Sequence, residues 1–87
     1  MESMAKVTGP ITQDVAMQML AARLEHARKE HPKFATGPWN AYFVIRAELE
    51  ELALAMANEG PARIIDEALD VAATAMRLVM GEVVDRL

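Results

Sequence analysis

Four acidic side chains of the sequence stand where the surrounding residues are apolar. Glu48 and Glu51 lie in one apolar run, Glu67 and Asp70 lie in the next, and the members of each pair are three residues apart. Carboxylates that gather on an apolar surface repel each other, and two like charges about 4 Å apart cost about 4 kcal/mol even at an effective dielectric of about 20. Such a group keeps some of its protons or binds cations. Oxygen ligands without histidine or cysteine suit Mg²⁺, with Mn²⁺ as a substitute, better than Zn²⁺, so the four acids are candidate magnesium ligands.

Three helical segments are predicted, and the last two must position these acids. Thr12 can cap a first, amphipathic helix, which is expected to end near Glu30 because a proline two residues later disfavours helical geometry. A second helix is expected from about Trp39 to Asn58, with a proline in its first turn. The stretch "HPKFATGPWN", residues 31–40, is predicted to be the connecting loop, in which Thr36 or Gly37 can cap the second helix.

The second and third helices are expected to form an antiparallel hairpin. Gly60 is predicted to end the second helix in a left-handed conformation, and Pro61 is well suited to begin the third helix at once. The third helix is expected to continue into the C-terminal region, with Gly81 as a weak point. No stretch has the alternation of a strand, so the predicted fold class is all-α. The predicted organisation is a flexible N-terminal tail at residues 1–10 and a single all-α domain at residues 11–87.

A rotation of about 100° per residue places the four acids on the facing sides of this hairpin. Glu48 falls inside the apolar stripe of the second helix and Glu67 inside that of the third, while Glu51 and Asp70 lie on the shoulders. At about 1.5 Å per residue, Glu51 and Glu67 are each roughly 10 Å from the turn, and the other two acids are each about 14 Å from it. All four carboxylates are therefore expected to converge on one patch. The alternative is that arginines neutralise single acids and leave no metal site.

Few basic or aromatic residues are placed to bind a phosphorylated ligand. Lys33, Arg63 and Arg77 are candidate phosphate ligands, although the two arginines can instead pair with the acids of the third helix. His31 lies in the loop before the second helix, from which it could reach a ligand. Trp39 could stack on a base, but an aromatic residue at the start of a helix more often fixes that helix to the core.

Composition narrows the class of protein. The 87 residues suffice for one domain, and 53% of them are hydrophobic, which is a large share for so short a chain. We therefore expect the three-helix protomer to complete a helical bundle as a homodimer or homotetramer, through the back of the second helix at Phe43, Ala47 and Leu54. A net charge of -4 argues against a nucleic-acid polymer as partner. The sequence has no cysteine, no membrane-spanning apolar run and no signal-peptide pattern, which predicts a cytoplasmic protein without a membrane partner.

Together, the motifs "ELEEL" and "EALDV" resemble the signature of the all-α nucleoside triphosphate pyrophosphohydrolases, the MazG-like superfamily. They supply the pairs Glu48 with Glu51 and Glu67 with Asp70, and fifteen residues separate the two pairs. The resemblance covers roughly residues 39–80. The upstream stretch "HPKF" is similar to short phage and mobile-element versions of the family.

The resemblance implies Mg²⁺-dependent hydrolysis of a nucleoside triphosphate between the α and β phosphates, which gives a monophosphate and pyrophosphate. It implies that Glu48, Glu51, Glu67 and Asp70 bind the metal and that Glu48 or Glu51 also orients the attacking water. It further implies homodimers or homotetramers in which helices from two chains build each site. Two alternatives stay open: a phosphoribosyl-ATP pyrophosphatase-like enzyme, and a catalytically silent helical dimer that keeps the scaffold as an adaptor or accessory protein.

Overall fold

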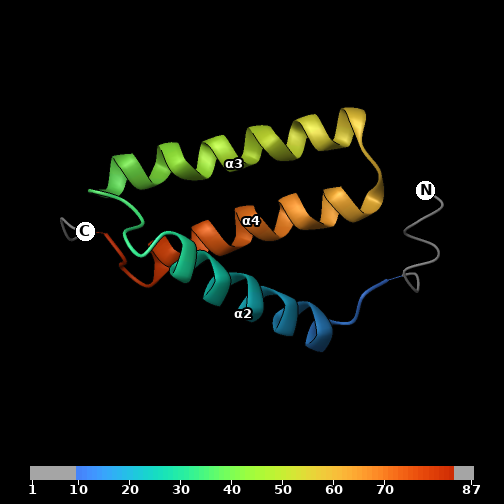
Figure 1. Ribbon diagram of the computed structural model, residues 1–87, viewed down its shortest axis with the longest axis horizontal. Helices are drawn as coiled ribbons and strands as arrows, with labels where there is room; N and C mark the ends of the chain where they lie inside the picture. Colours follow the sequence, from blue (N-terminus) through green and yellow to red (C-terminus); the bar gives the residue numbers. More distant parts are fainter. Residues whose placement is uncertain (1–9, 84–87) are drawn as a thin grey trace.

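Three helices account for most of the chain that the structure describes, which is residues 10–83 of a computed structural model. They are α2 (Gln13–Glu30), α3 (Pro38–Asn58) and α4 (Pro61–Val79). Figure 1 shows α4 in the middle, with α3 alongside it and α2 on its other side. The prediction of an all-α, three-helix chain is therefore confirmed for the described residues. The predicted N-terminal tail, residues 1–10, lies almost wholly outside them.

The helix α2 begins where its capping side chain predicts. Thr12 has extended backbone, with φ -68° and ψ 158°, and its hydroxyl accepts a hydrogen bond from the backbone N–H of Val15 at 3.3 Å. The helix ends at Glu30, because His31 precedes Pro32 and leaves helical geometry with φ -134°. No residue of α2 is buried, however, and Val15 in its first turn is 46% exposed, although the helix was predicted to be amphipathic. The reason is that α2 rests on α4 alone and makes no close approach to α3.

The two-residue connection between α3 and α4 differs from its prediction. Gly60 is not left-handed, since its φ of -85° and ψ of 173° are those of an extended chain. Glu59 is also extended, and its N–H donates to the carbonyl oxygen of Ala55 at 2.8 Å. Gly60 instead caps α4, because its carbonyl oxygen accepts from the N–H groups of Arg63 and Ile64 at 3.1 and 3.2 Å. The predicted left-handed stop is wrong because the proline that follows a residue favours extended geometry at that residue.

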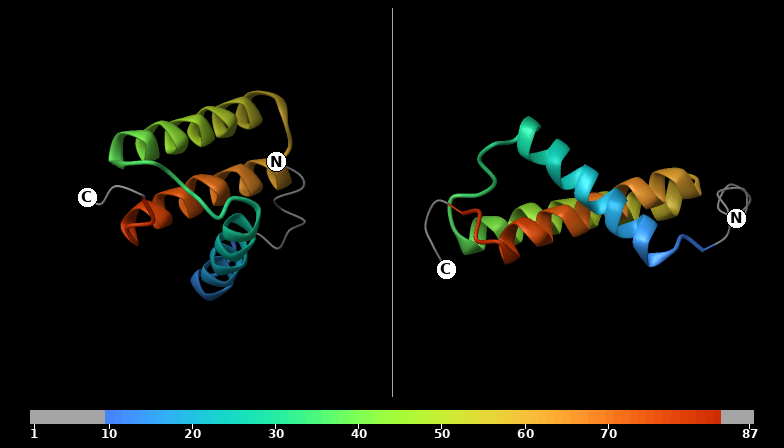
Figure 2. Two further views of the ribbon diagram at one scale, coloured as in Figure 1. Left: turned by 60° about the vertical axis from the view of Figure 1, so that its left-hand side comes forward. Right: turned by 90° about the horizontal axis from the view of Figure 1, so that it is seen from below.

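Small side chains form the contact between the helices. Ala41 and Ala55 of α3 and Ala73 of α4 are at most 1% exposed, and no large side chain of the described residues is fully buried. Alanines at these positions let the backbones of α3 and α4 come close along most of their length, as both views of Figure 2 agree. Because α2 approaches only α4, the surface of α4 that lies between α2 and α3 stays open.

After α4 the chain turns back toward the connection between α2 and α3. Gly81 has a positive φ of 73°, in the left-handed region that glycine favours, and the helix ends two residues before it. This turn brings the carboxylate of Glu82 to two arginines, Arg28 and Arg77. The next residue pairs with Ala35 in an isolated parallel bridge. The C-terminal segment thus ties the end of α4 to the end of α2.

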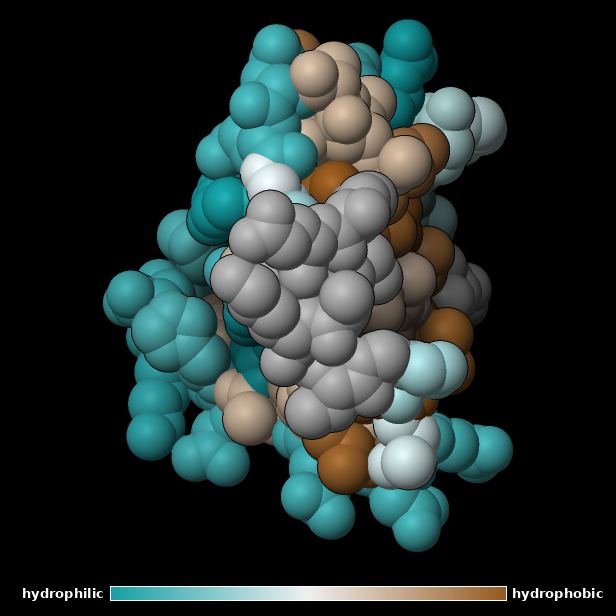
Figure 3. All heavy atoms as spheres, turned by 90° about the vertical axis from the view of Figure 1, so that its right-hand side faces the viewer, coloured by the Kyte–Doolittle hydropathy of each residue, from teal (hydrophilic) through white to brown (hydrophobic). Residues whose placement is uncertain are grey.

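Large apolar side chains lie exposed on the outer face of α3. Each is between 47% and 74% exposed, and the group consists of Trp39, Tyr42, Phe43, Leu49, Leu54 and Met56. Seen from the end at which α3 and α4 are joined, most hydrophilic side chains lie on one side of the described surface and most hydrophobic ones on the other (Figure 3). None of the described helices combines the length and the apolar character that crossing a membrane requires.

Candidate metal centre

Three of the four predicted acids meet where α3 and α4 face each other. Glu48 of α3 and both Glu67 and Asp70 of α4 each offer a carboxylate oxygen, and these three oxygens all lie within 4.8 Å of one another. Glu51 is outside this group and is exposed. It projects from α3 about 60° away from Glu48, which leaves it at the rim of the cluster. The structure therefore brings together three of the four predicted ligands.

Burial makes this acidic cluster electrostatically costly. Glu67 is 5% exposed, while Glu48 and Asp70 are half-buried. Burial raises the pKa of Glu67, as does its hydrogen bond with the Asp70 carboxyl group, whereas the charge of Arg63 opposes the rise. Burial likewise raises the pKa of Glu48, helped by the negative charges of Glu51, Asp70 and Glu67. Full ionisation of the cluster is thus opposed, which favours a bound proton or a bound cation.

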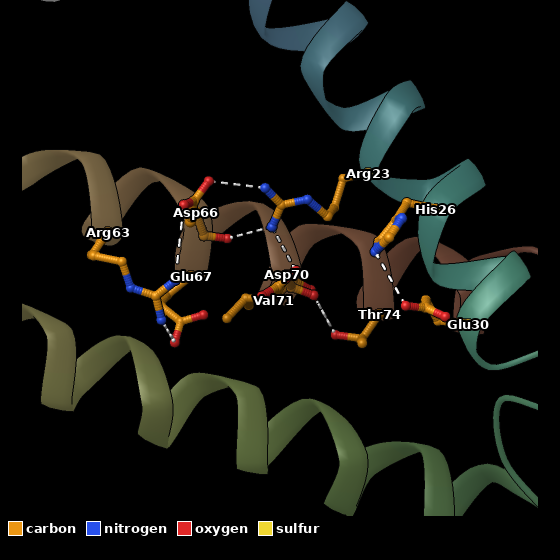
Figure 4. Close-up of polar contacts among 9 residues, drawn as sticks. All are labelled: Arg23, His26, Glu30, Arg63, Asp66, Glu67, Asp70, Val71 and Thr74. Carbon is orange, nitrogen blue, oxygen red and sulfur yellow. Dashed lines mark hydrogen bonds and ion pairs between the residues drawn. The ribbon is translucent and has the colours of Figure 1, made fainter.

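Two arginines already bring positive charge to these acids. In α2, Nη1 of Arg23 donates to Oδ1 of Asp70 at 2.7 Å, and its Nη2 donates to Oδ1 of Asp66 at 2.9 Å. In α4, Nη2 of Arg63 donates to Oε2 of Glu67 at 3.3 Å. Figure 4 shows both guanidinium groups beside the carboxylates of α4. Arginines thus neutralise two of the acids in part, as the alternative to metal binding predicted. One of these arginines, Arg23, belongs to α2, a helix that the sequence alone did not connect with the site.

The donor set nevertheless fits a hard divalent cation. Mg²⁺ takes oxygen ligands, keeps several waters, and is commonly held by one or two carboxylates together with phosphates of a substrate. Each arginine contact engages one oxygen of its carboxylate. Within residues 10–83, the carboxylate of Glu48 has neither an ion pair nor a hydrogen bond, unlike those of Glu67 and Asp70. Glu48, with the remaining oxygens of Glu67 and Asp70, could therefore hold Mg²⁺ or Mn²⁺.

The cluster opens into a cleft of about 590 Å³ between α2, α3 and α4. Glu48 and Asp70 line it, together with Thr74, whose hydroxyl donates to the carbonyl oxygen of Asp70 at 2.9 Å. Most of the basic residues of the cleft come from α2 and the loop that follows it. The basic lining residues are Arg23, His26, His31, Lys33 and Arg77. A ligand in this cleft would meet carboxylates from all three helices, including Glu30 of α2, and basic groups mainly from α2 and its loop.

The predicted substrate-binding residues are divided by this geometry. His31 and Lys33 line the cleft, whereas Trp39 lies on the outer face of α3 with 74% of its surface exposed and does not line it. Arg63 is engaged by acids of its own helix and of the connection before it. Arg77 is 3% exposed and donates from Nε to Oε1 of Glu82 at 2.8 Å. Its guanidinium group therefore serves contacts inside the fold.

The chain has no match that would assign the site. No family model matches it, and neither a curated protein nor a solved structure does. Its chemistry therefore follows from three properties: clustered carboxylate oxygens, a cleft beside them, and basic groups on the same cleft. These properties favour a ligand that brings several negative charges together with a divalent cation.

Proposed function

We propose that this protein is a Mg²⁺-dependent nucleoside triphosphate pyrophosphohydrolase of the MazG-like type, located in the cytoplasm. The observation that carries the proposal is the meeting of Glu48, Glu67 and Asp70 within 4.8 Å, at the edge of a cleft that also has basic lining. A triphosphate has about four negative charges, and an acidic site can accept it only through bridging cations. The site's acids and its basic groups thus serve one substrate class from two sides.

Each residue has a role in the proposed reaction. Glu48, Glu67 and Asp70 hold the cation, and Glu48 or the rim residue Glu51 orients the water that attacks the α-phosphorus. Bound Mg²⁺ would polarise the α-phosphate and offset the charge on the departing pyrophosphate. The basic residues of the loop and of α2 contact the phosphates. The products are a nucleoside monophosphate and pyrophosphate.

Pyrophosphate release is expected to depend on Mg²⁺ and on Glu48. Glu48→Gln should lower kcat/KM at least about tenfold, because a neutral amide binds a divalent cation more weakly than a carboxylate does. Glu25→Gln is the matched control, since Glu25 is an exposed acid of α2 that pairs with Lys29 at 3.5 Å and does not line the cleft. The measurement is pyrophosphate formed from a panel of triphosphates with and without Mg²⁺. No release from any of them with Mg²⁺ or Mn²⁺ would contradict the enzymatic proposal.

The same proposal includes an assembly. The antiparallel hairpin of α3 and α4 completes a helical bundle by pairing with another copy, as a homodimer or homotetramer. Phe43 and Leu54 support this, because they are 56% and 62% exposed on the outer face of α3. An obligate dimer interface buries on the order of 2,000 Å² or more in total, for which this apolar face is a suitable centre.

Charges on the outer face of α3 are expected to split the assembly. The double variant Phe43→Asp/Leu54→Asp should sediment as a monomer where the wild type sediments as a dimer or tetramer, because an interface that buries unpaired carboxylates loses several kcal/mol. Sedimentation velocity over a range of protein concentrations measures this. The control Gln13→Glu/Gln18→Glu adds the same charge to exposed positions of α2 and should keep the wild-type state. A wild type that is monomeric at all concentrations refutes the assembly.

A catalytically silent helical dimer, acting as an adaptor or accessory protein, is the second candidate. It is favoured by the arginine contacts, since Arg23 and Arg63 already neutralise part of the charge of Asp70 and Glu67. In such a protein these pairs hold the helices together and no cation binds. A melting temperature that Mn²⁺ leaves unchanged would support it. A phosphoribosyl-ATP pyrophosphatase-like enzyme needs the same site, so phosphoribosyl-ATP belongs in the substrate panel.

A further inference from the structure

Arg23 connects α2 to the acids of α4 through three hydrogen bonds. Its Nη1 donates to Oδ1 of Asp70 at 2.7 Å and to the backbone carbonyl oxygen of Asp66 at 2.9 Å, and its Nη2 donates to Oδ1 of Asp66 at 2.9 Å. The side chains of Arg23 and Asp70 are 23% and 34% exposed, so water screens this ion pair only in part. The same Asp70 carboxylate belongs to the three-acid cluster.

We propose that Arg23 is the built-in counter-ion of the acidic cluster and that it gives up Asp70 when a divalent cation binds. This inference rests on the proposed function, because it takes Glu48, Glu67 and Asp70 as the metal ligands. A guanidinium group and a doubly charged ion repel each other when both lie against one carboxylate, and partial burial strengthens that repulsion. Arg23 keeps its place near α4 in the exchange, because Asp66 offers it two further acceptors.

Arg63 is the weaker competitor of the two arginines. Its contact with Glu67 is longer, at 3.3 Å, and its side chain is 52% exposed. It also approaches Glu59 at 3.5 Å, so its charge is shared with an acid outside the cluster. The stronger competition for the cation therefore comes from α2.

Mn²⁺ affinity of Arg23 variants tests the exchange. Isothermal titration calorimetry near neutral pH is expected to show Arg23→Met binding Mn²⁺ about tenfold tighter than the wild type, which corresponds to about 1.4 kcal/mol. Arg23→Lys keeps the charge and should bind within about threefold of the wild type. The matched control is Lys29→Met, which removes the same charge from an exposed position of α2, where Lys29 pairs with Glu25. It should bind within about twofold of the wild type, because only long-range charge is lost.

A second measurement needs no variant and covers the case in which Arg23→Met does not fold. Titration of the ¹⁵N-labelled wild type with Mg²⁺ should shift the side-chain N–H resonances of Arg23 and leave in place those of Arg28, which pairs with Glu82 and does not line the cleft. Mn²⁺ binding to the wild type that is unchanged or weaker in Arg23→Met, or an Arg23 resonance that saturating Mg²⁺ does not move, overturns the inference and leaves the metal site standing. Absence of Mn²⁺ binding to both the wild type and Arg23→Met overturns the metal site and this inference together.

Discussion

Glu67→Gln is expected to make the metal-free protein more stable and to remove most of its affinity for divalent cations. Glu67 is the most buried acid of the cluster, at 5% exposed, and it faces the carboxylates of Glu48 and Asp70. A glutamine has no charge to desolvate and none to repel its neighbours, and its carbonyl oxygen can still accept from Arg63. In the metal-free protein, the substitution therefore removes an unfavourable buried charge. In the metal-bound protein, it removes one of the three proposed ligands.

The raised pKa of Glu67 sets the pH dependence of this gain. Its causes are burial first and then the hydrogen bond with Asp70. A carboxyl group whose folded pKa lies above its unfolded value of 4.5 binds more protons in the folded state, so stability falls as pH rises from 4.5 to the folded pKa and stays low above it. Glu67→Gln has no carboxyl group at this position, so this loss of stability at higher pH is absent from the variant. The variant should gain most over the wild type at about pH 8 and least at about pH 4, measured by urea unfolding in EDTA.

Addition of Mn²⁺ is expected to reverse the order of stability. The wild type gains stability from any ligand that binds only its folded state, whereas the variant lacks one of the three proposed metal ligands and should bind Mn²⁺ at least about 100-fold more weakly. Pyrophosphate release should fall in proportion. Glu25→Gln again provides the control, because Glu25 is an exposed acid of α2 outside the cleft. A Glu67→Gln protein that is less stable than the wild type in EDTA would show that Glu67 serves the fold through its arginine and not a cation.

The acid pairs show what local sequence pattern can predict. Pro38 and Pro61 mark the first residues of α3 and α4, because proline suits the first helical position, and helical periodicity then placed Glu48 and Glu67 on facing sides. The same periodicity put Glu51 on a shoulder. Whether a shoulder residue reaches its partner helix depends on how the two helices cross, and this angle is set by the alanines at the contact, not by spacing along one helix.

Long-range pairs lay beyond the sequence pattern. Arg23 and Asp70 are 47 positions apart, and helical periodicity relates only residues of one helix, so it could not pair an arginine of α2 with an acid of α4. Glu82 and Arg28 are 54 positions apart, and the turn that brings them together depends on the positive φ of Gly81, so this pair could not be predicted either. The family resemblance, the enzymatic activity and the homo-oligomer stay predictions, because they depend on a ligand or on a second chain.

Arg77→Met is expected to lower the free energy of unfolding by about 3 kcal/mol, through contacts that have no part in metal binding. Besides its bond from Nε to Glu82 at 2.8 Å, Arg77 donates from Nη1 and Nη2 to the carbonyl oxygens of Ala27 and Pro32 at 3.5 and 3.4 Å. Its guanidinium carbon lies 5.1 Å from the centroid of the Phe34 ring. One buried side chain thus joins the end of α4 to the end of α2, to the loop and to the C-terminal segment.

The estimate follows from what the substitution leaves behind. Removing one partner of a buried ion pair costs about 3–5 kcal/mol, and the lower end applies because Glu82 is 25% exposed and keeps Arg28. The melting temperature of a domain of this size should fall by roughly 15 °C, measured at fixed protein concentration. Arg28→Met removes the same charge from a more exposed partner of Glu82 and should cost much less. Equal losses of stability from both substitutions would show that Glu82, and not Arg77, provides the stabilising charge. Unchanged Mn²⁺ affinity in Arg77→Met would show that the Arg77 contacts act independently of the proposed metal ligands.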